Sequence, residues 1–345
     1  MPAPQIMTPR QVVLDALAFK RPGYVPWAWE PTQVCARRLR EYLGTDDLTD
    51  FIGSHFLDLG SQLRRFAVVD GDFNRDAYGV LWDRTIDKDI GVPVEWPIRR
   101  PEDLDAYRWP DPLDPRWYEG MAEAIARNGG RLFTRYKLGF SLYERAWTMR
   151  GMTDLLMDMV DRPEFVDRLL DEIVEHNLAQ IHRAIDLGVD AIYFGDDYGS
   201  QRGLIMGHDR WRRFIKPRLA RMFAVVRQAG KVVCLHSCGK VAELFDELVE
   251  IGLNVFNPFQ PEVMDVFSLK RQYHGRLAFH GGLSIQKTLP FGTPDDVRRA
   301  TRDLVALGRD GGYILSPSHA VPADVPPENL VAMMDELRCQ VRSIP

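Results

Sequence analysis

The feature that most constrains the fold is a regular alternation of apolar runs and amphipathic segments along residues 131–319. Short runs rich in β-branched and aromatic residues stand at 131–136, 190–197, 231–238, 254–260, 276–282 and 311–319. Helical sequences separate the runs: residues 163–188 and 240–252 each close at a glycine, and residues 293–308 open with Thr-Pro and two acids. This alternation predicts βαβ units and a parallel sheet.

The ends of the runs favour a barrel over an open sheet. A doubly wound sheet gathers its ligands at one switch point, whereas a (β/α)8 barrel draws polar groups from many strand ends at one face. Here polar residues end nearly every run: Lys137, Asp196, Asp197, His236, Cys238, Asn257, Gln260, His280, Ser316 and His319. No glycine-rich phosphate loop follows an early run. The predicted fold is therefore an α/β (β/α)8 TIM barrel with an N-terminal elaboration.

The first 115 residues are less regular than the rest. The sequence predicts helices over 8–19 and 31–44, an extended segment at 21–31, a hairpin within 78–98 and a proline-punctuated excursion at 99–115. We expect residues 1–345 to form a single domain. In it, residues 1–115 elaborate the barrel entrance and residues 116–345 carry the regular βα repeats.

Composition and charge exclude several classes of protein. The chain is 45% apolar and 27% charged, with a formal charge of -5 and no long block of Lys and Arg, so we expect no nucleic-acid partner. No apolar run approaches the roughly 18 residues of a membrane span, and the first residues lack a signal-peptide pattern. A cytoplasmic location and no membrane contact are expected. Four scattered cysteines predict reduced thiols.

His236 and Cys238 are the strongest metal-ligand candidates. They stand two residues apart at a predicted strand end, so both side chains leave the same face. Zinc takes imidazole nitrogen and thiolate sulfur, and catalytic zinc sites use three protein ligands. A third ligand would come from another strand, from among His319, His280, Asp196 and Asp197. The alternative is that the pair is merely buried, since free cysteine is often a core residue, as we expect of Cys234.

Asp196 and Asp197 follow a strand that ends in glycine. Adjacent strand residues face opposite ways, so at most one of these carboxylates should enter the cavity, and the sequence does not decide which. His280, beside two glycines, fits either a ligand or a buried hydrogen-bonded histidine. His319, on a proline-rich loop, fits either a residue over the barrel mouth or an exposed one.

Several motifs carry a family resemblance. Residues 232–265, 278–299 and 311–330 resemble the second half of the uroporphyrinogen decarboxylase-like superfamily, and "DAYGVLWDR" and "DDYGSQRGLIM" are similar to it too. The resemblance covers most of the chain from about residue 75 onward and implies a (β/α)8 barrel.

The superfamily has two branches that matter here. Its cofactor-free decarboxylases carry an arginine-rich motif near the start, where this chain has "WEPTQVCARRL", so the motif is absent. His236 and Cys238 match the His-x-Cys zinc pair of the corrinoid methyltransferases, whose third ligand is a cysteine after the last strand. His319 stands at that place. A His-Cys-His zinc site, a weakened site and no metal site all remain open.

The resemblance implies a zinc-dependent methyltransferase that moves a methyl group between a corrinoid protein or small donor and a thiol or similar acceptor. Zinc would be the cofactor, and a partner protein would supply the corrinoid. Asp196, Asp197 and His319 are the predicted catalytic residues. The predicted substrate-binding residues are Tyr198, Asn257, Gln260 and His280.

Two other functions stay open. One is a cofactor-free decarboxylase or lyase that acts on another carboxylate, with an aspartate stabilising a protonated intermediate and His319 as the acid. The other is a non-catalytic corrinoid-binding or regulatory barrel. The family suggests a monomer or homodimer. Neither methyl donor nor acceptor is identified by the sequence.

Overall fold

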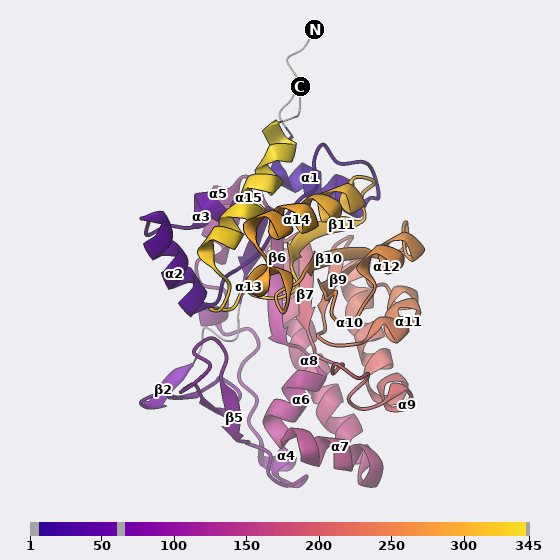
Figure 1. Cartoon of the computed structure of the whole chain (residues 1–345). Coiled ribbons are helices and arrows are strands. Elements are labelled where there is room, and N and C mark those ends of the chain that lie inside the picture. The colour runs from indigo at the N-terminus through magenta and orange to yellow at the C-terminus, as the bar shows by residue number, and fades with distance from the viewer. Residues whose placement is uncertain (1–6, 61–65, 343–345) are drawn as a thin grey trace. The chain divides into compact units, whose positions relative to one another are not determined.

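The computed structural model describes residues 7–60 and 66–342 and has an α/β architecture (Figure 1). Its main sheet has seven strands in the order β1-β6-β7-β8-β9-β10-β11, which is also their order along the chain. The pairs β6/β7, β7/β8, β9/β10 and β10/β11 are parallel. The predicted α/β class and parallel sheet are confirmed.

Every apolar run singled out in the sequence forms a strand of this sheet. The strands are β6 (Phe133–Phe140), β7 (Ala191–Gly195), β8 (Val232–His236), β9 (Val255–Phe259), β10 (Ala278–Leu283) and β11 (Tyr313–Pro317). The remaining strand, β1 (Phe56–Leu59), was not predicted. It is only four residues long, and it lies outside the part of the sequence in which apolar runs alternate with helical segments.

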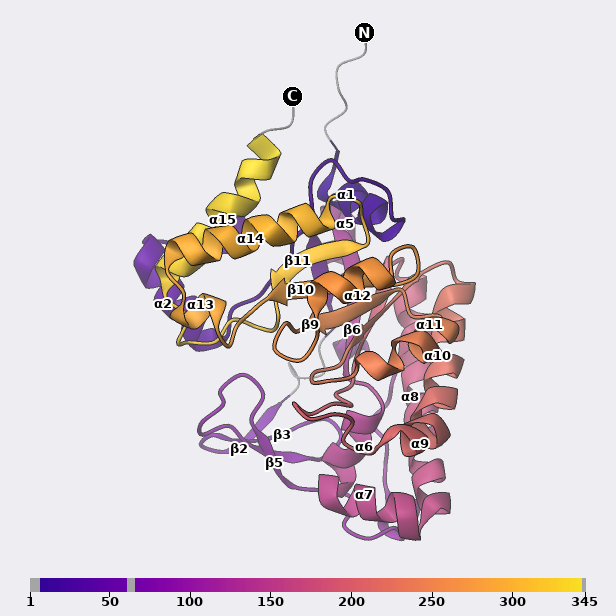
Figure 2. The same ribbon diagram turned by 45° about the vertical axis from the view of Figure 1, so that its right-hand side comes forward.

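The chain divides into two compact units. Unit 1 comprises Met1–Leu57, Asn128–Phe133 and Asn254–Pro345. Its helices are α1 (Pro9–Leu17), α2 (Gln33–Leu43), α3 (Thr49–Ile52), α12 (Val266–Gln272), α13 (Thr288–Phe291), α14 (Pro294–Gly308) and α15 (Pro327–Arg342). Within this unit α14 packs along α15 and against β10 and β11 (Figure 2).

Unit 2 comprises Asp58–Arg127 and Thr134–Leu253. Its helices are α4 (Asp103–Ala106), α5 (Met121–Asn128), α6 (Tyr143–Arg150), α7 (Met152–Asp161), α8 (Pro163–Asp186), α9 (His208–Arg210), α10 (Lys216–Gln228) and α11 (Phe245–Glu250). Short 3-10 turns cover Pro115–Trp117 and Ala242–Leu244, and a π-helical stretch, Trp211–Ile215, leads into α10. The long helix α8 packs against α10.

Unit 2 also holds a separate antiparallel sheet of four strands: β2 (Ala67–Asp70), β3 (Phe73–Arg75), β4 (Leu81–Asp83) and β5 (Val92–Glu95). Its last two strands pair Asp83 with Val92. The hairpin predicted within residues 78–98 is thus confirmed.

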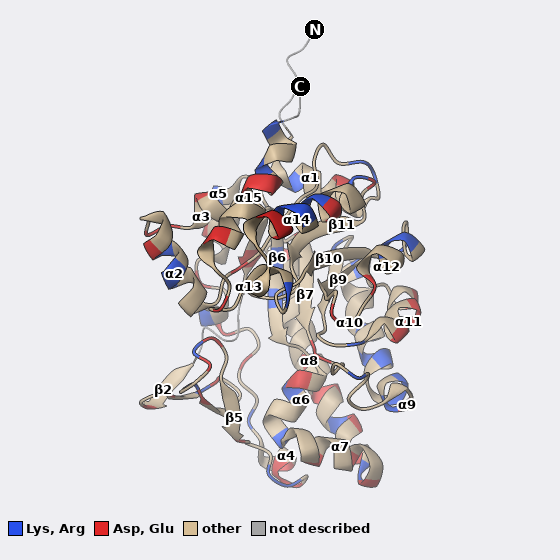
Figure 3. Cartoon of the chain, in the orientation of Figure 1, with Lys and Arg blue, Asp and Glu red and all other residues tan. Residues whose placement is uncertain are grey.

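Helix ends follow the capping chemistry visible in the sequence. Thr8 Oγ1 accepts from Gln11 N at 3.2 Å at the start of α1, and Gly44 ends α2 with φ +66°. At the start of α14, Thr293 and Asp296 form a reciprocal capping box. Acidic and basic residues interleave along the same helix (Figure 3).

The extended segment predicted at residues 21–31 pairs with two parts of unit 1. Ala28 N donates to Leu315 O at 3.2 Å, and Leu315 N donates to Pro26 O at 2.9 Å. On the other side His55 N donates to Trp27 O at 3.1 Å. Residues 26–28 therefore lie between β11 and the residue that precedes β1. Within residues 7–60 and 66–342, no helix has both the length and the hydropathy of a membrane span.

Candidate metal centre

The register of β7 and β8 brings the predicted site residues to one edge of the sheet. Gly195 on β7 is the direct partner of His236 on β8. One residue further on, Asp196 N donates to His236 O at 2.9 Å. The segments that carry the two aspartates and Cys238 therefore leave the sheet side by side.

His236 and Cys238 face each other, as their spacing predicts. Cys238 Sγ lies 3.4 Å from His236 Nε2. The other ring nitrogen, Nδ1, lies 2.9 Å from the hydroxyl of Tyr193, a β7 residue. The histidine side chain is 19% exposed and Cys238 is half-buried, so both can be reached by a ligand.

Asp197 is the aspartate that faces this pair. Its Oδ1 accepts from Cys238 N at 2.7 Å and lies 3.6 Å from His236 Nε2. Burial raises the pKa of the Cys238 thiol above its usual value, and the charge and hydrogen bond of Asp197 raise it further.

Asp196 is instead fully buried. Its carboxylate accepts from Tyr143 N at 3.1 Å and Glu144 N at 2.7 Å, the first backbone donors of α6, and from the Tyr198 hydroxyl at 2.7 Å. Burial raises the pKa of Asp196 to about 7, although these hydrogen bonds oppose the rise. Tyr198 is also fully buried, so both side chains serve the attachment of α6.

Sequence reasoning missed Glu144. It looks like an ordinary acidic residue in the first turn of a helix, yet it is 8% exposed. Burial, followed by the negative charges of Asp197 and Asp196, raises its pKa well above the usual value. Carboxylates gathered beside the half-buried Cys238 thiol form an environment that a cation would stabilise, which fits a metal ion at Cys238.

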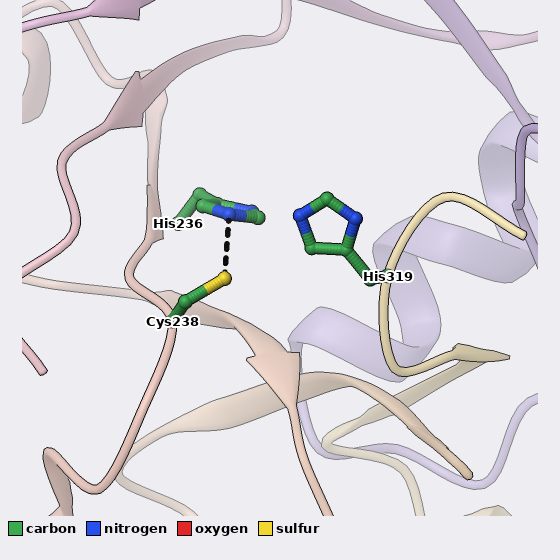
Figure 4. Close-up of side chains that lie close together, drawn as sticks. All are labelled: His236, Cys238 and His319. Carbon is green, nitrogen blue, oxygen red and sulfur yellow. Dashed lines mark hydrogen bonds between the residues drawn. The ribbon is translucent and has the colours of Figure 1, made fainter. Parts of the chain in front are cut away.

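His319, on the loop after β11, supplies the third predicted ligand. One ligand atom each from His236, Cys238 and His319 all lie within 4.8 Å of one another (Figure 4). Two imidazoles and a thiolate are a donor set that zinc accepts.

The other predicted residues have hydrogen bonds within unit 1. Asn257 Nδ2 donates to His280 O at 3.0 Å, and His280 Nε2 lies 3.2 Å from Ala28 O. These two side chains and Gln260 are all buried. Cys234 is 3% exposed and burial raises its thiol pKa to about 12, which confirms it as a core residue.

Comparison with known proteins identifies the family. The family model described as "Uroporphyrinogen decarboxylase (URO-D)" matches residues 82–339. The chain belongs to the uroporphyrinogen decarboxylase family. This match confirms the resemblance drawn from the motifs.

Relatives with two different names resemble this chain. A uroporphyrinogen decarboxylase of Chlorobaculum tepidum is 23% identical over 268 residues, which is 71% of each chain. A methylated-thiol–coenzyme M methyltransferase of Methanosarcina mazei is 22% identical over 345 residues, 94% of this chain and 88% of that one.

A solved structure supports the fold. The methyltransferase structure from Methanosarcina mazei superposes with a TM-score of 0.74 and 16% identity, covering 96% of this chain and 98% of that chain. At this identity the likeness establishes a shared fold.

Proposed function

We propose that this chain is a zinc-dependent methyltransferase that moves a methyl group from a corrinoid protein or small methyl donor to a thiol or similar acceptor. The observation that carries the proposal is the approach of the His236, Cys238 and His319 ligand atoms to within 4.8 Å. Similarity to a methylated-thiol–coenzyme M methyltransferase over 94% of the chain supports the reaction class.

In this proposal His236, Cys238 and His319 hold the zinc. Bound zinc lowers the pKa of the acceptor thiol, so that a thiolate is present at neutral pH. A centre with three protein ligands would have room for the acceptor sulfur. The thiolate would attack the methyl carbon of the donor, and the electron pair of the broken bond to the methyl group would leave with the donor. A partner protein supplies the corrinoid.

The neighbouring residues orient this centre. Asp197 fixes the Cys238 backbone through its 2.7 Å hydrogen bond. Asp196 and Tyr198, both fully buried, anchor the start of α6: Asp196 accepts from its first backbone donors and from the Tyr198 hydroxyl. Asn257, Gln260 and His280 stay substrate-binding candidates: Asn257 and His280 lie within β9 and β10, and Gln260 directly follows β9.

A second candidate function is a cofactor-free decarboxylase or lyase. The family model and the Chlorobaculum tepidum relative favour it, as does the gathering of Glu144, Asp196 and Asp197. In that case Asp197 would stabilise a protonated intermediate and His319 would donate the proton.

The test is a methyl-transfer assay with methylcobalamin as donor and a panel of small thiols as acceptors, followed by the methylcobalamin absorbance. We expect turnover with zinc, loss after chelation and loss in Cys238→Ser, with Cys339→Ser as the matched exposed-cysteine control. Full turnover in chelated protein would refute the zinc-dependent reaction. Corrinoid binding without turnover of any thiol would support a binding module instead.

We infer that residues 26–28 act as the eighth strand of a closed (β/α)8 barrel and that residues 1–345 form one domain. Hydrogen bonds from this segment to Leu315 and to His55 support the closure.

A further inference from the structure

Unit 1 contains a hollow that the proposed reaction does not use. Its volume is about 490 Å³, within the range of small-molecule pockets. Residues 21–25, the last turn of α14 with Arg309, and α15 line it. Among the described residues that line the hollow, none is a candidate metal ligand or a predicted substrate-binding residue.

The floor of the hollow is fixed by hydrogen bonds. The Gln340 side chain accepts from Val25 N at 2.8 Å and donates to Val25 O at 3.1 Å. The Tyr24 hydroxyl lies 3.0 Å from His55 Nε2. A pocket whose walls are already ordered loses less entropy when a ligand binds.

The charge of the hollow is unbalanced. Arg302 forms a two-bond ion pair with Glu336, at 3.1 and 2.9 Å. Arg21 and Arg309 also line the hollow, and within the described ranges neither side chain forms an ion pair. Three arginines against one glutamate leave an excess of positive charge. Guanidinium groups bind phosphate and carboxylate through paired hydrogen bonds.

We propose that this hollow is a second binding site, for a small molecule with phosphate or carboxylate groups, in which Arg21 and Arg309 bind the anion. Calorimetric titration of the full chain with pyrophosphate and with citrate tests it. We expect at least one of the two to bind, and Arg21→Gln/Arg309→Gln to weaken that binding by about tenfold or more.

The matched control is Arg127→Gln/Arg271→Gln, which removes two exposed arginines outside the hollow and changes net charge equally. It should bind as the wild type does. Preference for pyrophosphate identifies a phosphate ligand, and preference for citrate identifies a carboxylate ligand. Failure of both probes to bind, or equal loss in the two double variants, would overturn the proposal.

A second inference concerns His236 and rests on the proposed function. Tyr193 presents its hydroxyl 2.9 Å from His236 Nδ1. The Arg135 guanidinium lies over the tyrosine ring at 4.9 Å, and Lys137 Nζ lies 5.5 Å from its centre. Asp58 in turn holds Arg135 by two bonds, at 2.7 and 2.8 Å. The charged groups of Arg135 and Lys137 therefore lie against the Tyr193 ring, and Asp58 holds Arg135 in place.

We infer that Tyr193 is a positioning residue for the metal centre. A proton on Nδ1 that is donated to the Tyr193 oxygen leaves the lone pair that can bind a metal on Nε2. Nε2 is the nitrogen that faces Cys238, at 3.4 Å. Partners of this kind fix the tautomer and orientation of a metal-binding histidine.

Two measurements on Tyr193→Phe test this inference, with the exposed Tyr42→Phe as control. Zinc affinity, measured by chelator competition, should fall about tenfold or more in Tyr193→Phe only. Nitrogen NMR of metal-free protein should show His236 protonated on Nδ1 in the wild type and losing that preference in the variant. An unchanged tautomer and affinity would refute the positioning role. A wild type without zinc affinity would instead refute the proposed function.

Discussion

Two neighbouring residues, Asp196 and Asp197, have different environments although their side chains are identical. Asp196 is fully buried and accepts two backbone hydrogen bonds from the start of α6. Asp197 is 34% exposed and bonds to the backbone of Cys238. The alternation of strand faces predicted that the two would separate, but the identity of the outward one depended on the path of the chain after Gly195.

We therefore expect alanine substitutions at the two positions to differ in what they weaken: protein stability at Asp196 and zinc binding at Asp197. Asp196→Ala leaves buried α6 donors without their acceptor, so the free energy of unfolding should fall by about 2–4 kcal/mol. Asp197→Ala should lower it by less than about 1 kcal/mol while weakening zinc binding, since no helix start depends on it. Urea unfolding of both variants gives the comparison. Equal losses of stability would contradict the separate roles.

His176, a buried residue of α8, makes stability depend on pH. Its Nε2 lies 3.0 Å from Pro110 O, and Gln180 Nε2 lies 3.1 Å from its Nδ1, so the neutral ring has both nitrogens matched. Burial lowers the pKa of His176 from 6.5 to about 4. As pH falls below 6.5, the unfolded chain takes up the proton first, and the stability that the neutral ring confers is lost on the way to pH 4.

The expected loss between pH 7 and pH 5 is about 2 kcal/mol for this one histidine. In His176→Gln, which cannot take up that proton, the difference in unfolding free energy between the two pH values should shrink by about that amount. Urea titrations at both pH values measure it. An identical pH dependence in wild type and variant would show that His176 does not contribute.

At the scale of elements, the loops after β7 and β8 touch through their backbones. A Cβ added at Gly199 would lie 2.7 Å from Cys238 O and 2.6 Å from Val241 Cγ1. A Cβ added at Gly239, whose φ is +88°, would overlap the backbone of Gly199. Lys240 N also donates to Ser200 O at 2.8 Å. The loop that carries Cys238 can therefore take this position only because Gly199, in the neighbouring loop, has no side chain.

Gly199→Ala should push the Cys238 loop away and reduce zinc affinity about tenfold. Gly23→Ala is the control, because a Cβ there meets only Met7 at 3.5 Å. Chelator competition on both proteins measures the effect. Wild-type affinity in Gly199→Ala would show that the loop tolerates the methyl group.

The elements that sequence reasoning found are those with a local signal. Six strands and the helices between them follow from hydrophobic period and capping residues. By contrast, β1 and the pairing of residues 26–28 depend on partners far away in the sequence: Phe56 follows a bend, and Trp27 contacts Leu315. Glu144 and Tyr193 escaped notice for the same reason, since their environments come from other strands and helices.

At the scale of the whole molecule, the relatives of this chain are named for two different reactions, decarboxylation and methyl transfer. The family model spans residues 82–339, and relatives named as decarboxylase and as methyltransferase both match. The His-x-Cys spacing and the histidine after the last strand were readable from the sequence. The approach of their ligand atoms to within 4.8 Å could be seen only in the folded structure. The zinc content of the protein therefore tests which of the two chemistries this chain performs.

The most direct test is the metal content of freshly purified protein, measured by elemental analysis in the wild type and in single alanine variants of His236, Cys238 and His319. We predict about one zinc per chain in the wild type, lost in all three variants and retained in the controls His274→Ala and Cys339→Ser. Protein that holds no zinc even after zinc is added, or variants that keep it, would contradict a His-Cys-His centre and favour the decarboxylase.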